Sequence, residues 1–252
     1  MKIKALIFDV DGTLADTEEA HRRSFNLAFE RHGLAWHWSE DEYARLLKTT
    51  GGKERIGTYV DSLAIDADER RALKAQIPAI HRTKTDNYTQ MVSEGLVPLR
   101  EGVSHLIDEA KRAGVSVSIA TTTSLANIEA LLTVNLGRAA LDSFSVIGAA
   151  EQAQRKKPAP DVFEYVLKEL QENAADCVAI EDSANGLAAA KGAGLFTVIT
   201  PSPWTRDEDF SGADLVLPSL GSSPHPLRDI ENRFNLAREW GRRAHSTAMG
   251  EQ

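Results

Sequence analysis

The sequence predicts an α/β protein in which a mostly parallel sheet carries helices on both faces and is interrupted by an all-helical insert. Three observations predict this fold class. Short, wholly apolar runs recur along the chain, as expected of strands that are buried on both faces. Amphipathic helical patterns separate these runs, which is the alternation of a doubly wound, Rossmann-like sheet. The stretch from residue 16 to 94 contains helical patterns but no convincing strand.

The first predicted strand is Ala5 to Phe8. Comparable apolar runs follow at Val115–Ala120, Val146–Ile147, Cys177–Ile180, Phe196–Ile199 and, more weakly, Leu215–Leu217. The helices predicted between these strands cover Glu101–Arg112, Leu125–Leu136, Pro160–Leu170 and Asn185–Lys191. Between Arg228 and Arg243 the apolar residues recur at helical spacing, so a docked terminal helix is expected to bury Ile230, Phe234, Ala237 and Trp240.

The insert is predicted to contain several helices. Asp16-Thr17-Glu18-Glu19 and Ser39-Glu40-Asp41-Glu42 both carry the capping pattern of helix starts. A further helical stretch from about Asp68 to Met91 is expected to kink or break near Pro78. We therefore expect a sheet domain of residues 1–15 and 95–252 and a helical domain of residues 16–94, with a return hinge at Gly95–Pro98.

Composition excludes several classes of function. Hydrophobic residues make up 42% of the 252 residues and charged residues 26%, which excludes a disordered chain. The 29 Lys and Arg against 37 Asp and Glu give a net charge of −8, which argues against nucleic acid or an anionic membrane as partner. A single cysteine, Cys177, allows no intrachain disulfide. We expect a cytoplasmic monomer with a small-molecule substrate.

The chemistry is expected at Asp9-Val10-Asp11-Gly12-Thr13-Leu14, directly after the first strand. Residues i and i+2 of an extended chain point the same way, so Asp9 and Asp11 can face one reaction centre. Open α/β sheets bind ligands at the carboxyl ends of their strands. A turn whose acids only cap the backbone is the alternative.

Three further segments accompany this motif in a fixed order. They are Ile119-Ala120-Thr121, Lys157-Pro158 and Ile180-Glu181-Asp182-Ser183. Taken singly, each has an ordinary explanation: a strand-end hydroxyl, part of a solvated basic run, and a helix cap. Together with Asp9 and Asp11, they resemble the motifs of the haloacid dehalogenase superfamily of phosphohydrolases, over residues 9–182 and, by the order of elements, to about residue 220.

The resemblance implies a mechanism and a cofactor. Asp9 would attack phosphorus and form an aspartyl-phosphate, and Asp11 would serve as acid and then base. Thr121 and Lys157 would hold the phosphoryl oxygens. Thr122 and Thr123 leave the position of that hydroxyl open by one residue, and Thr122 is a candidate substrate contact. The implied Mg²⁺ site uses the Asp9 side chain, the Asp11 carbonyl, Asp182 and, through water, Glu181.

At finer grain the chain resembles the CbbY-type phosphatases of the beta-phosphoglucomutase-like branch. The most specific segment is Thr49-Thr50-Gly51-Gly52-Lys53-Glu54-Arg55, which is similar to the specificity loop of a helical cap. This family hydrolyses xylulose-1,5-bisphosphate, an inhibitor of Rubisco in the Calvin cycle. The resemblance implies sugar or phosphate contacts from cap residues, namely Glu18, His21, Lys53, Arg55, Arg82 and Lys84.

Other functions remain open from the sequence. A sugar-phosphate mutase uses the same motifs, and phosphoglycolate phosphatase has a substrate too small for the cap cations to hold. A non-catalytic phospho-acceptor or metal-dependent binding protein would also place an Asp at a strand end, although it has no need of a large helical cap.

Overall fold

The computed structural model describes residues 2–49 and 51–249, with side chains up to residue 240. The chain forms two compact units, which we call the core unit and the helical unit. The core unit contains the residues up to Asp16 and from Pro98 onward, and the helical unit is Thr17–Val97. The expected start of the helical domain, residue 16, differs from the observed start by one residue, and its expected end, residue 94, differs from the observed end by three.

The core unit is built on a sheet of order β3-β2-β1-β4-β5-β6, with every strand pair among the described residues parallel. This confirms the predicted fold class. The bounds are Ala5–Phe8 (β1), Ser116–Ala120 (β2), Ile147–Gly148 (β3), Cys177–Glu181 (β4), Phe196–Ile199 (β5) and Leu215–Val216 (β6). The strand order turns back between β1 and β4, and ligands of open α/β sheets bind beside such a point.

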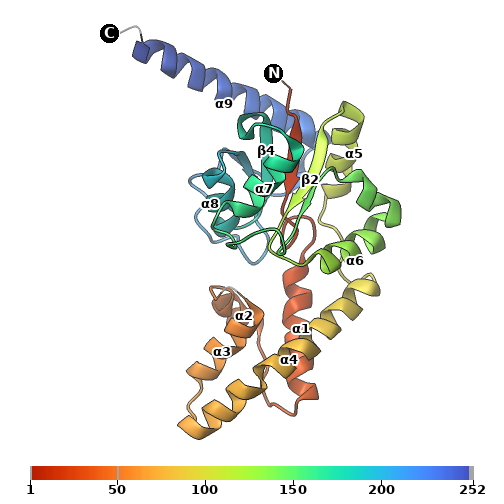
Figure 1. Cartoon of the computed structure of the whole chain (residues 1–252), viewed down its shortest axis with the longest axis vertical. Coiled ribbons are helices and arrows are strands. Elements are labelled where there is room, and N and C mark those ends of the chain that lie inside the picture. Colours follow the sequence, from red (N-terminus) through yellow and green to blue (C-terminus); the bar gives the residue numbers. More distant parts are fainter. Residues whose placement is uncertain (1, 50, 250–252) are drawn as a thin grey trace. The chain divides into compact units, whose positions relative to one another are not determined.

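Helices cover both faces of this sheet (Figure 1). On one face, α7 (Asp161–Leu170) and α8 (Ala184–Gly192) pack on a buried cluster that includes Cys177 and Ala179. Val178 pairs with Phe196 and faces the other way, because side chains alternate along a strand. The rings of Phe196 and Phe234 meet there at 5.4 Å, which places α9 (Pro226–Met249) on the second face beside α5 (Val103–Ala113). The remaining core helix, α6, is Leu125–Leu136.

The terminal helix α9 is docked over only part of its length. Ile230 and Phe234 are buried as predicted, but Ala237 is exposed and Trp240 is 75% exposed, so the expectation for these two residues is wrong. Arg238 supplies the physical reason, because its guanidinium donates to the Ala175 carbonyl at 2.6 Å. Trp240 lies two residues further, about 200° around the helix, and therefore points away.

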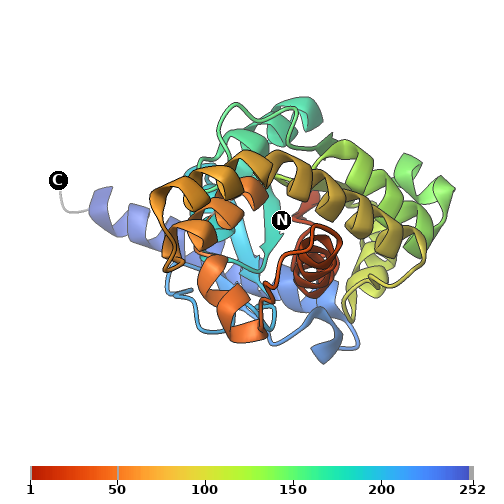
Figure 2. The ribbon, with the colours of Figure 1, turned by 90° about the horizontal axis from the view of Figure 1, so that it is seen from below.

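The helical unit contains α1 (Thr17–Arg31), α2 (Glu40–Leu46), α3 (Gly52–Ser62) and α4 (Ala67–Ser93). Both α1 and α3 pack on α4, and Figure 2 views α1 nearly along its axis with α4 running past it. An aromatic cluster of Phe25, Phe29 and Trp38 fills the interior. The predicted break near Pro78 is wrong, since α4 is continuous. Packing of α4 against two other helices offsets the one backbone hydrogen bond that a proline removes.

No helix in the described part of the chain, the long α4 and α9 included, carries an apolar stretch long enough to cross a lipid bilayer.

Candidate active site

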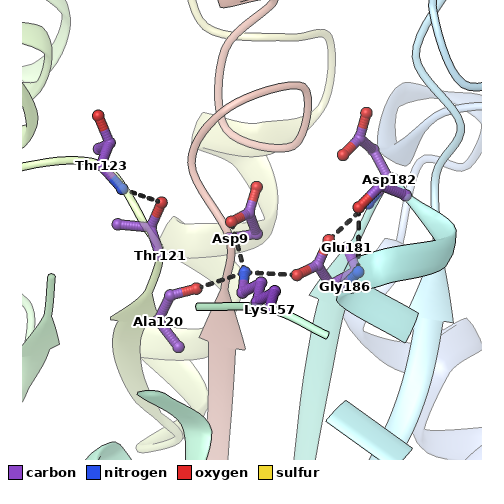
Figure 3. A network of polar contacts seen from close by, with 9 residues as sticks. Asp9, Ala120, Thr121, Thr123, Lys157, Glu181, Asp182 and Gly186 are labelled. Carbon is purple, nitrogen blue, oxygen red and sulfur yellow. Dashed lines mark hydrogen bonds and ion pairs between the residues drawn. The ribbon is translucent and has the colours of Figure 1, made fainter. Parts of the chain in front are cut away.

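Three neighbouring strands bring the motif residues of the core unit to one edge of the sheet. Asp9 follows β1, Thr121 follows β2, Glu181 is the last residue of β4, and Asp182 follows it. The pairing continues past β1, because the Asp9 amide donates to the Ile180 carbonyl at 3.0 Å. Figure 3 shows the Asp9 side chain between Thr121 on one side and the Glu181–Asp182 pair on the other. Segments far apart in the sequence thus converge because parallel strands end at a common edge.

Lys157 joins these strand ends. Its Nζ donates to Asp9 Oδ1 at 2.6 Å, to Glu181 Oε1 at 2.5 Å and to the Ala120 carbonyl at 2.8 Å (Figure 3). The ammonium also lies 4.9 Å from the ring centre of Phe163 on α7. All three ammonium protons therefore have acceptors, so Lys157 is held as a fixed positive charge among buried carboxylates.

Burial strongly perturbs these ionisable groups. Burial raises the pKa of Asp9 to about 7 with help from the Glu181 and Asp11 charges, while Lys157 acts in the opposite direction. Burial, followed by the charges of Glu181 and Asp9, raises the pKa of Asp182 well above its ordinary value. Burial lowers the pKa of Lys157, but Asp9 and Glu181 outweigh it and the net shift is upward. The cluster is short of positive charge, which is typical of a site that takes a cation.

The same carboxylates fit a divalent metal ion. Asp9, Glu181 and Asp182 are all buried, and each offers an oxygen within 4.8 Å of the others. Buried, oxygen-only donors are what Mg²⁺ prefers. Lys157 offsets only part of their charge, so a bound Mg²⁺ would relieve the repulsion that adds to burial in raising the pKa values of Asp9 and Asp182. The residues therefore fit the implied cofactor.

Two glycines make room for these carboxylates. Gly12 has a φ of 85°, which favours glycine, and a Cβ there would overlap the Asp182 carboxylate. A Cβ at Gly186, in the first turn of α8, would overlap the Glu181 carboxylate. The turn after β1 and the start of α8 thus approach the acids as closely as backbone allows.

The other predicted core residues lie at the same edge. Asp11 is half-buried and its charge contributes to the raised pKa of Asp9, so the two acids are neighbours. Asp11 lies beyond the end of β1, where it forms an isolated bridge with Ala15 across the turn at Gly12-Thr13-Leu14. The Thr121 hydroxyl is buried and accepts from the Thr123 amide at 3.3 Å, whereas Thr122 is half-buried.

In the helical unit, Glu18 and Arg55 are linked through Tyr43. The Tyr43 hydroxyl donates to Glu18 Oε2 at 2.7 Å and accepts from Arg55 Nη1 at 2.9 Å. Arg55 Nε is buried and has no hydrogen-bond partner among the described residues. Arg55 therefore has one guanidinium N–H without an acceptor in the described part of the chain. Tyr43, which was not singled out from the sequence, contacts and orients Arg55.

His21 and Lys84 form a second contact within the helical unit. Lys84 Nζ lies 2.8 Å from His21 Nδ1, and the His21 ring stacks on Tyr88 with 4.0 Å between centroids. Burial, and then the charges of Lys84 and Lys53, lowers the pKa of His81 to about 4. His81 was not singled out from the sequence, and the charges of Lys84 and Lys53 that add to the effect of burial indicate that both cations lie near it.

Two predicted cations of this unit are placed differently. Lys53 is exposed on the first turn of α3, so the segment expected to be a loop is helical from Gly52 onward. Arg82 is exposed and lies two residues before Lys84 on α4, about 200° away around the helix. Thr50, which also belongs to the predicted loop, lies outside the described residues.

Sequence reasoning missed three polar residues that contact the acidic edge. Arg100 donates to the Gly12 carbonyl, and Thr205 Oγ1 donates to Asp182 Oδ2 at 3.2 Å. Ser202 interacts with Thr205, with 3.1 Å between the two hydroxyl oxygens. Ser202 and Thr205 follow β5, so the rule that led to Asp9 and Asp182, polar residues after a buried strand, would have found them.

The sheet order, the acids after β1 and β4 and the lysine between them define a class of protein. The family model of the haloacid dehalogenase-like hydrolases matches residues 3–194 of this chain. The match covers well over half of the sequence and includes the ends of β1, β2 and β4, so the chain belongs to this family.

Relatives narrow the class. Protein CbbY of Rhodobacter capsulatus is 47% identical over 223 residues, which cover 88% of this chain and 96% of that protein. A plasmid-encoded CbbY of Cupriavidus necator is 49% identical over 227 residues, or 89% of each chain. A mutant CbbY from Rhodobacter sphaeroides, solved in complex with xylulose-(1,5)bisphosphate, is 47% identical with a TM-score of 0.77, over 87% of this chain and 96% of its own. Within its family the chain is a CbbY-type phosphatase.

Proposed function

We propose that this protein is an Mg²⁺-dependent sugar-phosphate phosphatase that converts xylulose-1,5-bisphosphate to xylulose-5-phosphate and phosphate through an aspartyl-phosphate. The observation that carries the proposal is the buried cluster of Asp9, Lys157 and Glu181 at the edge of the sheet. The CbbY of Rhodobacter sphaeroides in complex with xylulose-(1,5)bisphosphate supports the choice of substrate.

The chemistry proceeds in two displacements. An Asp9 carboxylate oxygen attacks phosphorus while the ester O–P bond breaks, and Asp11 gives its proton to the leaving sugar oxygen. Asp11, now ionised, takes a proton from water. That water attacks the same phosphorus and breaks the bond to Asp9, releasing phosphate and restoring both acids. The charge of Asp11 contributes to the raised pKa of Asp9, so the two acids are close to each other. This proximity suits a mechanism in which both act at the same phosphorus atom.

Lys157 and Thr121 stabilise the group that is transferred. The Lys157 charge keeps Asp9 available as an anion and offsets charge on the phosphoryl oxygens. The Thr121 hydroxyl at the end of β2 provides a neutral donor. Asp9, Glu181 and Asp182 would hold Mg²⁺, which supplies the charge that lets two anions approach.

Removal of metal tests the proposed cofactor. Excess chelator should abolish phosphate release, Mg²⁺ should restore it, and Ca²⁺ should not, since Ca²⁺ takes more ligands in looser geometry. Independently of activity, Mg²⁺ at a hundred times its Kd should raise the Tm of the stripped protein by about 5–11 °C. Asp182→Asn, which removes one ligand, should lose this shift. Full activity in chelator contradicts the metal site.

The substrate is tested by phosphate release from a panel of sugar mono- and bisphosphates. Xylulose-1,5-bisphosphate should give the highest kcat/KM and one phosphate per molecule. Isomerisation of a sugar phosphate without net release of phosphate would identify a mutase instead. A panel in which small phosphates such as phosphoglycolate react fastest would contradict the proposed substrate.

A bisphosphate has a second anion that the motif residues of the core unit do not recognise. We propose that the helical unit supplies cations for it, with Arg55 and Lys53 on the first turns of α3. Arg55 Nε has no hydrogen-bond partner among the described residues. This favours Arg55 as the principal contact of the second phosphate. Lys84 contributes further positive charge in the same unit, and this charge helps to lower the pKa of His81.

Loss of Lys53 or Arg55 should weaken the discrimination between a sugar bisphosphate and a monophosphate. A charge-assisted contact contributes about 1.5–3 kcal/mol, or about ten- to 150-fold in an equilibrium. Lys53→Ala and Arg55→Ala should lower kcat/KM for the bisphosphate by up to about that factor, with the larger loss for Arg55. Hydrolysis of an aryl phosphate, which has no second anion, should change little.

The matched control is Arg71→Ala, because Arg71 is an exposed cation of the same unit whose contact is Asp68 one turn away. This variant should keep the wild-type ratio of bisphosphate to aryl phosphate activity. If Lys53→Ala and Arg55→Ala also keep that ratio, the helical unit does not bind the second phosphate. Equal losses on both substrates indicate a role in folding.

A further inference from the structure

The segment after β5 forms a bracket beside the Asp182 carboxylate. The Thr200 amide donates to the Glu181 carbonyl at 2.8 Å, so the segment continues the β4–β5 pairing past the ends of both strands. Thr205 Oγ1 accepts from the Ser202 amide at 2.9 Å and donates to Asp182 Oδ2 at 3.2 Å. Ser202 is 1% exposed, which fixes the turn that presents Thr205.

Arg100 ties this segment to the turn after β1. Its Nη1 donates to the Gly12 carbonyl and, at 2.7 Å, to the Thr200 carbonyl, and its Nη2 donates to the Pro201 carbonyl at 2.8 Å. Its own amide donates to the Leu14 carbonyl at 2.9 Å. A single guanidinium thus holds together the two backbone segments that flank Asp182, since Gly12 lies against the Asp182 carboxylate.

We propose that Thr205, Ser202 and Arg100 are positioning residues that hold the Asp182 carboxylate in its metal-binding orientation. Asp182 shares a buried space with Asp9 and Glu181, and three anions so close together repel one another. Lys157 contacts Asp9 and Glu181, whereas the Asp182 carboxylate accepts a hydrogen bond from the neutral Thr205 hydroxyl. A neutral donor orients a carboxylate without neutralising it, and so preserves the charge that a cation binds.

This inference rests on the proposed function, because it assumes that Asp182 is a metal ligand. Groups that orient metal ligands typically affect metal affinity by about 10–100-fold. Thr205→Val keeps the shape of the side chain but removes the hydroxyl, and Thr205→Ser restores it. The measurement is Mg²⁺ affinity by calorimetry on the full chain without substrate, together with the Tm in chelator.

Thr205→Val should bind Mg²⁺ about 10–100-fold more weakly than wild type, while Thr205→Ser should stay within a few-fold of it. Because the hydroxyl also accepts from the buried Ser202 amide, Thr205→Val should lower the Tm in chelator by about 2–12 °C, whereas Thr205→Ser should keep the wild-type Tm. Thr133→Val, which removes an exposed hydroxyl from α6, is the matched control and should leave both quantities unchanged.

Arg100 is tested in parallel with Arg238. Arg100→Gln should weaken Mg²⁺ binding within the same range. Arg238 also binds a backbone carbonyl, that of Ala175, but at the amino end of β4, so Arg238→Gln should leave Mg²⁺ affinity unchanged.

The outcomes separate the two proposals. Wild-type Mg²⁺ affinity in Thr205→Val overturns the positioning role and leaves the proposed phosphatase intact. Weakened binding that Thr205→Ser fails to rescue, accompanied by a lower Tm of Thr205→Ser in chelator, also overturns it in favour of a structural role. A wild-type protein that binds no Mg²⁺ overturns the metal site itself, and this inference with it.

Discussion

Replacing Asp9 by Asn is expected to lower kcat by about four to six orders of magnitude. The change keeps the size of the side chain and its place after β1, but it removes the anionic oxygen that we propose attacks phosphorus. An amide nitrogen or carbonyl oxygen is too weak a nucleophile to replace it. The measurement is steady-state phosphate release, with Asp142→Asn on an exposed part of the core unit as the control for a lost carboxylate.

Asp11→Asn should distinguish the proposed nucleophile, Asp9, from the proposed acid and base, Asp11. An aryl phosphate has a leaving group that needs little protonation, so the first displacement should still occur and release one aryl alcohol per enzyme. The second displacement should stall, because no base remains to deprotonate water. Asp9→Asn should give no such burst. Retention of more than about a tenth of wild-type activity in Asp9→Asn contradicts the assignment of Asp9 as the nucleophile.

Replacing Lys157 by Met is expected to reduce both activity and stability. The variant loses the charge that we propose contacts the transferred group, which corresponds to about 10²–10³-fold in kcat. It also leaves Asp9 and Glu181 buried without their cation. Breaking a buried ion pair costs about 3–5 kcal/mol, which lowers the Tm by about 6–20 °C in a protein of this size. Thermal unfolding in chelator measures the second effect.

The loss of stability should depend on pH. Burial raises the pKa of Asp9 to about 7 even though Lys157 opposes the shift, so without Lys157 the pKa rises further. A carboxyl whose pKa is raised in the folded state contributes stability that is present below its unfolded pKa and is lost as pH rises through its folded pKa. Metal-free Lys157→Met should therefore be closer to wild type at pH 5 than at pH 8.

Lys156→Met is the matched control, because Lys156 is the exposed neighbour of Lys157. It should retain wild-type kcat and Tm at both pH values. Similar behaviour of the two variants would show that the buried ion pairs of Lys157 matter neither for stability nor for turnover.

Much of the core unit could be predicted because the signals are local. An apolar run such as Ala5–Phe8 is buried on both faces only in a parallel sheet, and Asp9 follows it directly. The strands β1, β4 and β5 were located within one residue for the same reason. A polar residue after such a strand must lie at the carboxyl edge, so the acids of β1 and β4 could be expected to meet.

The helical unit was less predictable because its decisive contacts are between elements. Pro78 argues locally for a break, yet packing of α4 on α1 and α3 keeps one continuous helix. The same limit applies to α9 of the core unit, where Trp240 follows the apolar spacing but spacing does not show where the surface beneath the helix ends. Which cations of the unit are buried, as Lys84 is, and which exposed, as Lys53 is, also depends on packing.

The sequence by itself determined the fold class, the edge at which the acids gather and the residue types that carry phosphoryl chemistry, because each follows from strand periodicity and from what comes directly after a strand. Only the tertiary structure decided that Lys157 contacts both Asp9 and Glu181, that Tyr43 joins Glu18 to Arg55, and that Arg100 and Thr205 brace the Asp182 carboxylate. These contacts join residues that are up to 148 positions apart. A local pattern carries no information about them, since they form only when the strands have taken their order and register in the sheet and the helices have packed on one another.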